Sequence, residues 1–347
     1  MKYNKLGHSG VEVSELCLGT MTYGTQTSEA DAHRQMDMAM DAGMTFWDTA
    51  ELYPVTPISA QTYGRTEEFI GTWYQKTGRR NETVIATKHA GQGLSHIRGG
   101  KPIMGSTVRE AVEASLKRLQ TDHIDLYQLH WPNRGGYHFR QNWSYDPSGQ
   151  NTDDVTNQMR EVLEALKAEV DRGTIKHVGL SNETTWGTLK WLQLADEHGL
   201  PRMESVQNEY SLLYRMYDND MAEMTAHEGV GLLSYSPLAT GLLTGKYQNG
   251  AIPPGSRAGI GSGLGSRDTE RAFAATQAYL DLAQDHGIDP VHMALAWAKD
   301  RPFMTSVIIG ATTVEQLAHI IEGKDLVLSD QLKKKIDGIN RDFPLPY

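Results

Sequence analysis

The stretch Met44-Thr-Phe-Trp-Asp-Thr-Ala-Glu-Leu-Tyr53 joins a short apolar run to two groups that can exchange protons. Residues 44–47 have the character of a buried strand, and the run stops at a carboxylate, Asp48. A phenol, Tyr53, follows after one short loop. Groups of this kind serve in proton transfer but also arise for structural reasons, so the rest of the chain has to decide between the two.

The same unit of an apolar strand with a polar end recurs along the chain. We expect strands at residues 16–18, 44–47, 83–87, 124–129, 175–180, 205–206, 231–235 and 306–309, most of them followed by a helix. Parallel strands that are buried on both faces are apolar throughout, as these are. An eightfold alternation of strand and helix favours a closed (β/α)₈ TIM barrel, with an open sheet as the alternative.

Other segments complete the predicted architecture. Residues 3–6 and 11–13 flank a glycine-containing turn, which predicts an N-terminal β-hairpin. Two long connections, 131–154 and 239–266, are expected to be functional loops at the C-terminal face of the barrel. Thr107 with Glu110 three residues later predicts a capping box at the start of a helix, and a further helix is expected at 216–227. No linker divides residues 1–347, so we expect one domain.

Composition narrows the class of protein. A net charge of −10 argues against nucleic acid or an anionic membrane as partner, because both attract basic patches. The single cysteine, Cys17, excludes an internal disulfide framework. There is no apolar signal region and no run of about 20 apolar residues, so a cytoplasmic location is expected. No feature of the sequence assigns an oligomeric state.

Polar residues stand where the predicted strands end. In a barrel these C-terminal ends surround one mouth, which is where barrel enzymes carry out their chemistry. Each residue alone has a structural explanation: His130 is compatible with a satisfied core histidine, and Lys88 with a surface-reaching side chain. Together they are hard to explain as structure, because burying unpaired polar groups is costly. The strand ends are Asp48, Lys88, His130, Ser181-Asn182, Gln207-Asn208, Tyr235-Ser236 and Gly310.

These residue types suit carbonyl reduction. A nearby cation such as Lys88 is expected to lower the pKa of the Tyr53 phenol, and Asp48 to keep Lys88 charged. Tyr53 would then donate a proton to a substrate oxygen that His130 positions. No side chain supplies a hydride, so a nicotinamide or flavin cofactor is required.

Competing chemistries have less support. The chain lacks the Gly-x-Ser-x-Gly motif of serine hydrolases, and its histidines show no convincing metal-ligand spacing, so no metal is expected. The glycine-rich residues 259–265 miss the spacing of a nucleotide-binding loop and do not follow a strand.

Several motifs resemble those of the aldo-keto reductase family, and they follow one another over nearly the whole chain. The resemblance is closest to the bacterial Tas-like subgroup. The motifs are Leu18-Gly-Thr-Met21, Phe46-Trp-Asp-Thr-Ala-Glu-Leu-Tyr53, Ala86-Thr-Lys88, Ser115-Leu-Lys-Arg-Leu119, Asp125-Leu-Tyr-Gln-Leu-His-Trp-Pro132, Gly179-Leu-Ser-Asn182, Gln207-Asn208, Tyr235-Ser-Pro-Leu238 and Gly310-Ala-Thr312.

The resemblance implies a barrel that uses NADPH to reduce aldehydes or ketones by direct hydride transfer. It places the catalytic tetrad at Asp48, Tyr53, Lys88 and His130. The aromatic loop 131–154 suggests Trp131, Tyr137 and Trp143 as a wall of the substrate pocket. The implied cofactor residues are Gly19, Thr20, Met21, Ser181, Asn182, Gln207, Tyr235, Ser236, Pro237, Leu238, Lys246, Arg257, Gly310, Thr312 and Gln316.

Two departures from the family pattern concern the adenosine end. Many relatives carry a basic residue where Thr312 stands and an asparagine where Ile320 stands, so NADPH is favoured over NADH less strongly than usual. Gln316 also fits a capping box with Thr313, and both roles are compatible. An alternative function is a cofactor-binding regulatory subunit, as in related potassium-channel β subunits. The retained His130 favours an enzyme, because those subunits replace it.

Overall fold

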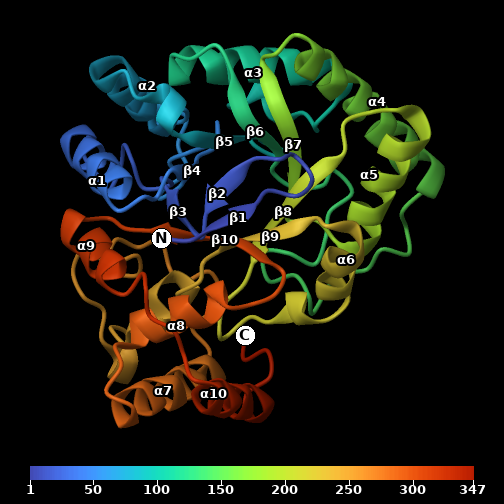
Figure 1. Cartoon of the computed structure of the whole chain (residues 1–347). Helices are drawn as coiled ribbons and strands as arrows, with labels where there is room; N and C mark the ends of the chain where they lie inside the picture. The colour runs from blue at the N-terminus through green and yellow to red at the C-terminus, as the bar shows by residue number, and fades with distance from the viewer.

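Eight parallel strands close into a barrel in the computed structural model, which describes residues 1–347 (Figure 1). Each strand pairs with its neighbours in chain order, and the last pairs with the first, which confirms the predicted (β/α)₈ barrel over the open sheet. The barrel strands are β3 (Leu16–Gly19), β4 (Phe46–Asp48), β5 (Val84–His89), β6 (Ile124–Leu129), β7 (Ile175–Ser181), β8 (Met203–Glu209), β9 (Gly231–Tyr235) and β10 (Met304–Gly310).

Helices surround the barrel, and part of the orange and red C-terminal region adds an outer layer of helices on one side (Figure 1). Their apolar faces pack on the outward-facing side chains of the strands in one large core. The helices are α1 (Glu29–Asp41), α2 (Arg65–Thr77), α3 (Gly105–Leu119), α4 (Thr152–Asp171), α5 (Thr185–His198), α6 (Asp220–Glu228), α7 (Glu270–Asp285), α8 (Pro290–Lys299), α9 (Val314–Glu322) and α10 (Asp330–Asp342).

The predicted N-terminal hairpin, β1 (Tyr3–Lys5) and β2 (Glu12–Ser14), lies across one end of the barrel (Figure 1). Its Leu6 and Val13 are fully buried and pack against inward-facing barrel residues such as Phe46 and Leu126. The hydroxyl of Ser14 accepts a hydrogen bond from the backbone N–H of Phe46 at 3.2 Å. The hairpin therefore closes the N-terminal end of the barrel and leaves the C-terminal end open.

Inward-facing residues change from apolar to polar along each strand. Alternate side chains of a strand point into the barrel, so positions two residues apart share that side. Phe46, Ala86 and Leu126 form part of a small buried apolar cluster in the lower barrel. The residues two positions later on the same strands are Asp48, Lys88 and Gln128. This alternation along each strand, which we call strand parity, therefore places a polar layer of inward-facing side chains directly above an apolar one.

Three local predictions were wrong in detail. Thr107 is not the N-cap of α3: the helix starts after Met104, and the Thr107 hydroxyl accepts from the Met104 N–H at 3.1 Å. Residues 216–218 form a separate 3₁₀ turn before α6. Thr313 does cap α9, but Gln316 accepts from the N–H of Thr312 at 2.9 Å instead of closing a box with Thr313.

None of the helices combines the length and apolar character that crossing a membrane requires.

Trp47 offers a test of the large hydrophobic core between the strands and the helices. Its fully buried ring lies 4.9 Å from the ring of Trp73 and stacks on Tyr74 at 5.9 Å, measured between centroids. We expect Trp47→Ala to lower the free energy of unfolding by about 3–5 kcal/mol, because it leaves a large cavity. Trp143, which is 74% exposed, is the matched control, and its change to alanine should cost less than about 0.5 kcal/mol. Urea denaturation measures both, and equal losses would contradict the packing described.

Candidate active site

The Lys88 ammonium group lies fully buried at the centre of the open end of the barrel. It donates to Asp48 Oδ2 and to the carbonyl oxygen of Thr49, both at 2.7 Å. It also lies 3.4 Å from the hydroxyl oxygen of Tyr53. The strand β5 supplies the lysine, and β4 with its following loop supplies the other groups. The ammonium thus has three oxygen partners, one of which is the phenol.

Asp48 is held from its other side. Its Oδ1 accepts from Gln207 Nε2 at 2.7 Å and from Gln128 Nε2 at 3.2 Å. Gln207 points inward from β8, across the barrel from β4, and Gln128 points inward from β6, the strand that pairs with β5. Because both oxygens of the carboxylate are fixed, Asp48 holds Lys88 in one orientation beneath Tyr53.

The environment shifts the pKa values of the site. Burial alone lowers the pKa of Lys88, but the neighbouring Asp48 carboxylate and Tyr53 outweigh this effect and raise it above its ordinary value. Burial also raises the pKa of Tyr53, against the opposing effect of Lys88. The expected lowering of the Tyr53 pKa is therefore wrong in net sign: Lys88 acts as predicted, but the loss of water outweighs it. At neutral pH the lysine is charged and the phenol keeps its proton.

His130 follows β6 and faces Tyr53, with the two ring centroids 5.8 Å apart. Burial, followed by repulsion from Lys88, holds the pKa of His130 well below its usual value. Its Nδ1 is buried without a hydrogen-bond partner in the protein. Its backbone carbonyl accepts from Asn182 Nδ2 at 2.9 Å, and Asn182 Oδ1 accepts from the hydroxyl of Tyr235 at 2.7 Å. The imidazole is neutral and close to the phenol.

Glu51 anchors the loop between Asp48 and Tyr53. This fully buried carboxylate accepts from the N–H of Ala90 at 2.6 Å and from both terminal nitrogens of Arg98 at 2.7 and 2.6 Å. A bidentate arginine–carboxylate pair fixes geometry as well as charge. Glu51 therefore ties the Tyr53 loop to the end of β5, the strand that carries Lys88.

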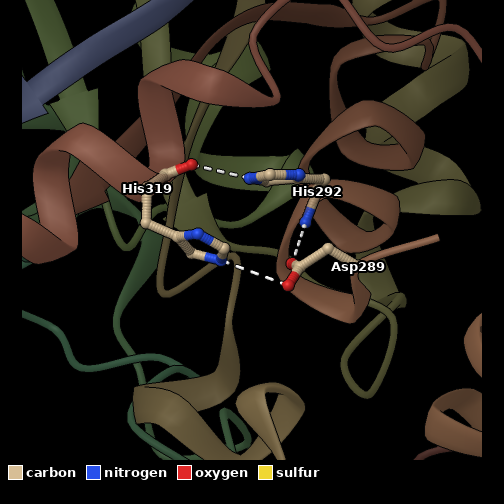
Figure 2. Close-up of side chains that lie close together, drawn as sticks. All are labelled: Asp289, His292 and His319. Atoms are coloured by element: carbon tan, nitrogen blue, oxygen red, sulfur yellow. Dashed lines mark hydrogen bonds and ion pairs between the residues drawn. The ribbon is translucent and has the colours of Figure 1, made fainter.

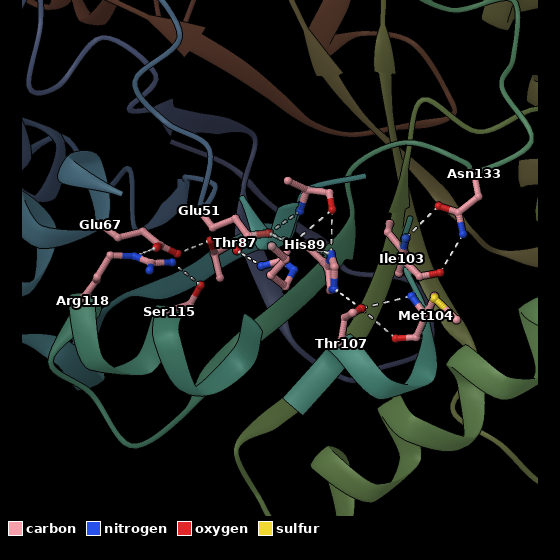
Figure 3. A network of polar contacts seen from close by, with 12 residues as sticks. Glu51, Glu67, Thr87, His89, Ile103, Met104, Thr107, Ser115, Arg118 and Asn133 are labelled. Carbon is pink, nitrogen blue, oxygen red and sulfur yellow. Dashed lines mark hydrogen bonds and ion pairs between the residues drawn. The ribbon is translucent and has the colours of Figure 1, made fainter. Parts of the chain in front are cut away.

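The outward-facing side of β5 is fixed to the helices in the same way (Figure 3). The Thr87 hydroxyl donates to Glu67 Oε1 at 2.6 Å, and the other oxygen of Glu67 accepts from Arg118 at 2.6 Å. Two residues on, a ring nitrogen of His89 lies 3.0 Å from the hydroxyl of Thr107. With Thr87 and His89 both held on α2 and α3, the strand cannot rotate Lys88 away from Asp48.

A large cavity opens above these residues, with a volume of about 1250 Å³. We call it the mouth cavity. Asp48, Tyr53 and His130 line its floor, and Lys88 lies just beneath. Every residue predicted to hold the cofactor also lines it: Gly19, Thr20, Met21, Ser181, Asn182, Gln207, Tyr235, Ser236, Pro237, Leu238, Lys246, Arg257, Gly310, Thr312 and Gln316.

The mouth cavity is large enough for a dinucleotide together with a small substrate, since pockets for single drug-sized ligands usually measure about 300–1,000 Å³. Two of its cations have no carboxylate partner. The Arg257 guanidinium donates only to the carbonyl of Gly263 at 3.3 Å, and the Lys246 ammonium lies 5.3 Å from the ring centroid of Tyr247. Unpaired cations in a cavity fit the phosphates of such a ligand.

The aromatic residues of the long loop divide into two groups. Trp131 lines the mouth cavity next to His130, with ring centroids 4.9 Å apart. Tyr137 and Trp143 do not line it, and Trp143 faces solvent. Phe139, which the sequence did not single out, is part of the lining and packs edge-on against Trp131 at 6.4 Å.

Asp289, His292 and His319 cluster at the end of the cavity where Thr312 and Gln316 lie (Figure 2). Asp289 caps α8, and its Oδ2 lies 3.2 Å from His319 Nε2. His292 Nε2 donates to the carbonyl of His319 at 2.6 Å. The two rings stack at 29° with centroids 4.6 Å apart. Hydrogen bonds and ion pairs within the cluster already engage one ring nitrogen of each histidine and the Asp289 carboxylate.

Sequence reasoning missed some residues around the site. Gln128 and Glu209 each lie two positions after another inward-facing residue, so strand parity was an available signal for both. Arg140 and Arg267 also line the cavity, and both form ion pairs with Glu209. They come from two separate loops, and no local pattern connects them.

Comparison with known proteins agrees with this geometry. The model of the Aldo/keto reductase family matches residues 15–341. Protein tas of Escherichia coli strain K12 is 42% identical over 350 residues, which cover 100% of this chain and 99% of that protein. The uncharacterized oxidoreductase YrpG of Bacillus subtilis is 33% identical, over 100% and 97%. A probable voltage-gated potassium channel subunit beta of Oryza sativa is 28% identical, over 99% and 98%. The chain belongs to the aldo/keto reductase family.

Proposed function

We propose that this oxidoreductase uses NADPH to reduce aldehydes or ketones to alcohols, with Tyr53 as the acid that protonates the carbonyl oxygen. The observation that carries the proposal is the contact of the buried Lys88 ammonium with both Asp48 and the Tyr53 phenol. Bound NADPH supplies the hydride that no side chain can provide. The phosphates are assigned to Lys246 and Arg257, and the adenosine end to Gly310, Thr312 and Gln316.

The pKa shifts support Tyr53 rather than His130 as the proton donor. Burial raises the pKa of Tyr53, so the phenol holds a proton at neutral pH. Burial and Lys88 hold the pKa of His130 well below its usual value, so the imidazole has no second proton to give. A neutral imidazole still donates one hydrogen bond, which positions and polarises the substrate oxygen.

Lys88 makes the proton transfer possible. When Tyr53 gives up its proton, a phenolate forms in a buried site, which is costly without a neighbouring cation. The Lys88 ammonium lies 3.4 Å from the phenol oxygen and stays charged because Asp48 lies 2.7 Å away. Lys88 thus stabilises the phenolate only as it forms during the reaction. Stabilisation at that stage, and not before, lowers the barrier and raises the rate.

The positions of the other polar residues fit the remaining tasks. Asn182 bonds to both the His130 carbonyl and the Tyr235 hydroxyl, so it connects the proposed proton relay to the ring proposed to stack on the nicotinamide. Ser181 and Gln207 lie beside it in the mouth cavity, and with Asn182 they are proposed to bind the carboxamide.

Removing the Tyr53 hydroxyl tests the proposal directly. We expect Tyr53→Phe to lower kcat by about 10²–10⁴-fold, the usual contribution of a positioned acid, with the dissociation constant of NADPH nearly unchanged. The assay follows NADPH oxidation with a broad panel of aldehydes, and fluorescence titration gives the cofactor affinity. A variant within tenfold of the wild-type rate would exclude Tyr53 as the acid.

The pH profile tests the assignment of the two protonation states. Reduction needs the protonated phenol, and the pKa of Tyr53 is raised, so kcat should not fall until pH exceeds the ordinary tyrosine value of about 10. Because the pKa of His130 is lowered, no inflection should appear near about 6.5, where a free histidine titrates. An inflection there that disappears in His130→Gln would contradict a neutral imidazole.

Cofactor preference depends on Thr312, which contributes a hydroxyl and no charge. Its backbone N–H and hydroxyl both donate to Gln316 Oε1, at 2.9 and 3.1 Å. We expect the wild type to bind NADPH several-fold more tightly than NADH, and Thr312→Arg to widen that ratio by about tenfold, since an arginine pairs strongly with the 2′-phosphate. NADH serves as the internal control, because it differs only in that phosphate. An unchanged ratio would place the 2′-phosphate elsewhere.

The name of the rice relative, a probable voltage-gated potassium channel subunit beta, supports one alternative: a cofactor-binding subunit of a larger assembly. The aldehyde panel separates the two functions. Tight NADPH binding with negligible turnover, together with co-purification of a partner protein, would favour the subunit.

A further inference from the structure

Two arginines that line the mouth cavity bind a single carboxylate, and a third arginine of the cavity lies near enough to be repelled by them. Glu209, at the end of β8, is 3% exposed. Its Oε1 accepts from Arg267 Nε and Nη2 at 2.9 and 2.6 Å, and its Oε2 accepts from Arg140 Nη1 at 3.1 Å. Arg257 is the third guanidinium, and it pairs with no carboxylate. The group as a whole carries more positive than negative charge.

The pKa of Arg257 agrees with this surplus. It is lowered from the ordinary arginine value, first by burial and then by repulsion from Arg267 and Arg140. The C-terminal Tyr347 adds a further contact, as its hydroxyl donates to Glu209 Oε1 at 3.2 Å. Glu209 is therefore fully engaged, and the positive charge around it is not neutralised from within the protein.

Of the two arginines bound to Glu209, Arg140 is the one with free donors. Arg267 uses Nε and Nη2 on Glu209 and Nη1 on the carbonyl of Leu264. Arg140 uses only Nη1, which leaves Nε and Nη2 available on a side chain that lines the cavity. Both Arg140 and the preceding Phe139 have positive φ, 63° and 56°, a conformation that costs energy for residues with side chains. The backbone strain is thus located where the chain turns Arg140 towards the cavity.

The position of Arg140 relates it to the reacting end of the cavity. Tyr53 faces His130, His130 faces Trp131, and the Trp131 ring packs against Phe139, the neighbour of Arg140 in the chain. A ligand that lies along this row of rings has its carbonyl at Tyr53 and its far end towards Arg140. The rings of this row are aromatic and uncharged at neutral pH, so Arg140 is the group that selects for charge.

The cations of the mouth cavity then divide between two ligands. Lys246 and Arg257 are assigned to the phosphates of the cofactor, and the donors of Arg267 are used by Glu209 and by the carbonyl of Leu264. Arg140 is then the cation that remains available to a substrate. Building on the proposed carbonyl reduction, we propose that the physiological substrate is an anionic carbonyl compound, whose carboxylate or phosphate binds Arg140 while its carbonyl oxygen lies at Tyr53.

Paired substrates test this inference in the full-length protein with NADPH. Each pair shares a chain length and differs in charge: 4-oxobutanoate with butanal, 5-oxopentanoate with pentanal, and glyceraldehyde 3-phosphate with glyceraldehyde. We expect the anionic member of at least one pair to show a kcat/KM about tenfold to a hundredfold higher, mainly through a lower KM, as one charge-assisted hydrogen bond implies. The carboxylate and phosphate pairs distinguish the two anions.

Variants assign the preference to Arg140. Arg140→Gln should reduce the anionic-to-neutral ratio of kcat/KM to near one, and Arg140→Lys should restore part of it, because lysine keeps the charge but loses the fork of donors. Arg160→Gln, which removes an equal charge from the exposed face of α4, is the matched control and should leave the ratio unchanged. Thermal denaturation of each variant shows whether the fold persists.

The outcomes separate the two proposals. If neutral aldehydes are reduced as well as their anionic counterparts, or if Arg140→Gln keeps the preference, the inference about the anion is wrong and carbonyl reduction stands. If Arg140→Gln fails to fold, Arg140→Lys serves as the test instead. An anionic-to-neutral ratio of kcat/KM between one and the wild-type value supports the inference in that variant, and an unchanged wild-type ratio overturns it. If no member of any pair is reduced, both proposals fail together.

Discussion

The fully buried Lys88 ammonium is the constraint on which the open end of the barrel depends. A charge without water needs compensation, and removing one partner of such a pair typically costs about 3–5 kcal/mol. Asp48 provides the countercharge at 2.7 Å, and Gln207 on β8 and Gln128 on β6 fix the other oxygen of Asp48. Four strands, β4, β5, β6 and β8, are therefore connected through one ion pair, so the electrostatic requirement and the geometry of the proposed reaction are satisfied by the same contacts.

Strand parity explains why much of this site was predictable. Asp48 and Lys88 each follow an apolar inward-facing residue by two positions, and the closed barrel brings parallel strand ends to one mouth. A short apolar run followed by a polar residue is visible in the sequence, and so is its eightfold recurrence. The positions of the four proposed catalytic residues and the lining of the mouth cavity were predicted from those two facts and from the family resemblance. The helix starts depended on single hydrogen bonds, and Thr107 was misplaced because its hydroxyl bonds back to Met104.

The features that could not be predicted depend either on the size of competing effects in the folded protein or on the backbone conformation of loops. The sign of the Tyr53 pKa is a balance between burial and Lys88, and only the folded chain sets how much water is lost. The aromatic content of the long loop is visible in the sequence, but which of its rings reach the cavity is not: Phe139 lines it, while Trp143 faces solvent. Phe139 and Arg140 both have positive φ. Propensities for these residues favour the opposite backbone region.

The distribution of charge explains how a protein with a net negative charge could bind the anionic ligands proposed for it. The chain carries −10 overall, yet Lys246, Arg257, Arg140 and Arg267 all line one cavity. Cations that line a cleft focus the local potential and attract an anion whatever the sign of the total. Lys88 takes no part in this attraction, because it is sealed beneath the floor and neutralised by Asp48. The separation matters for the proposed chemistry: an anion that bound Lys88 directly would compete with Tyr53 for its cation, whereas the cations on the wall could hold the proposed ligand without disturbing the proposed proton donor.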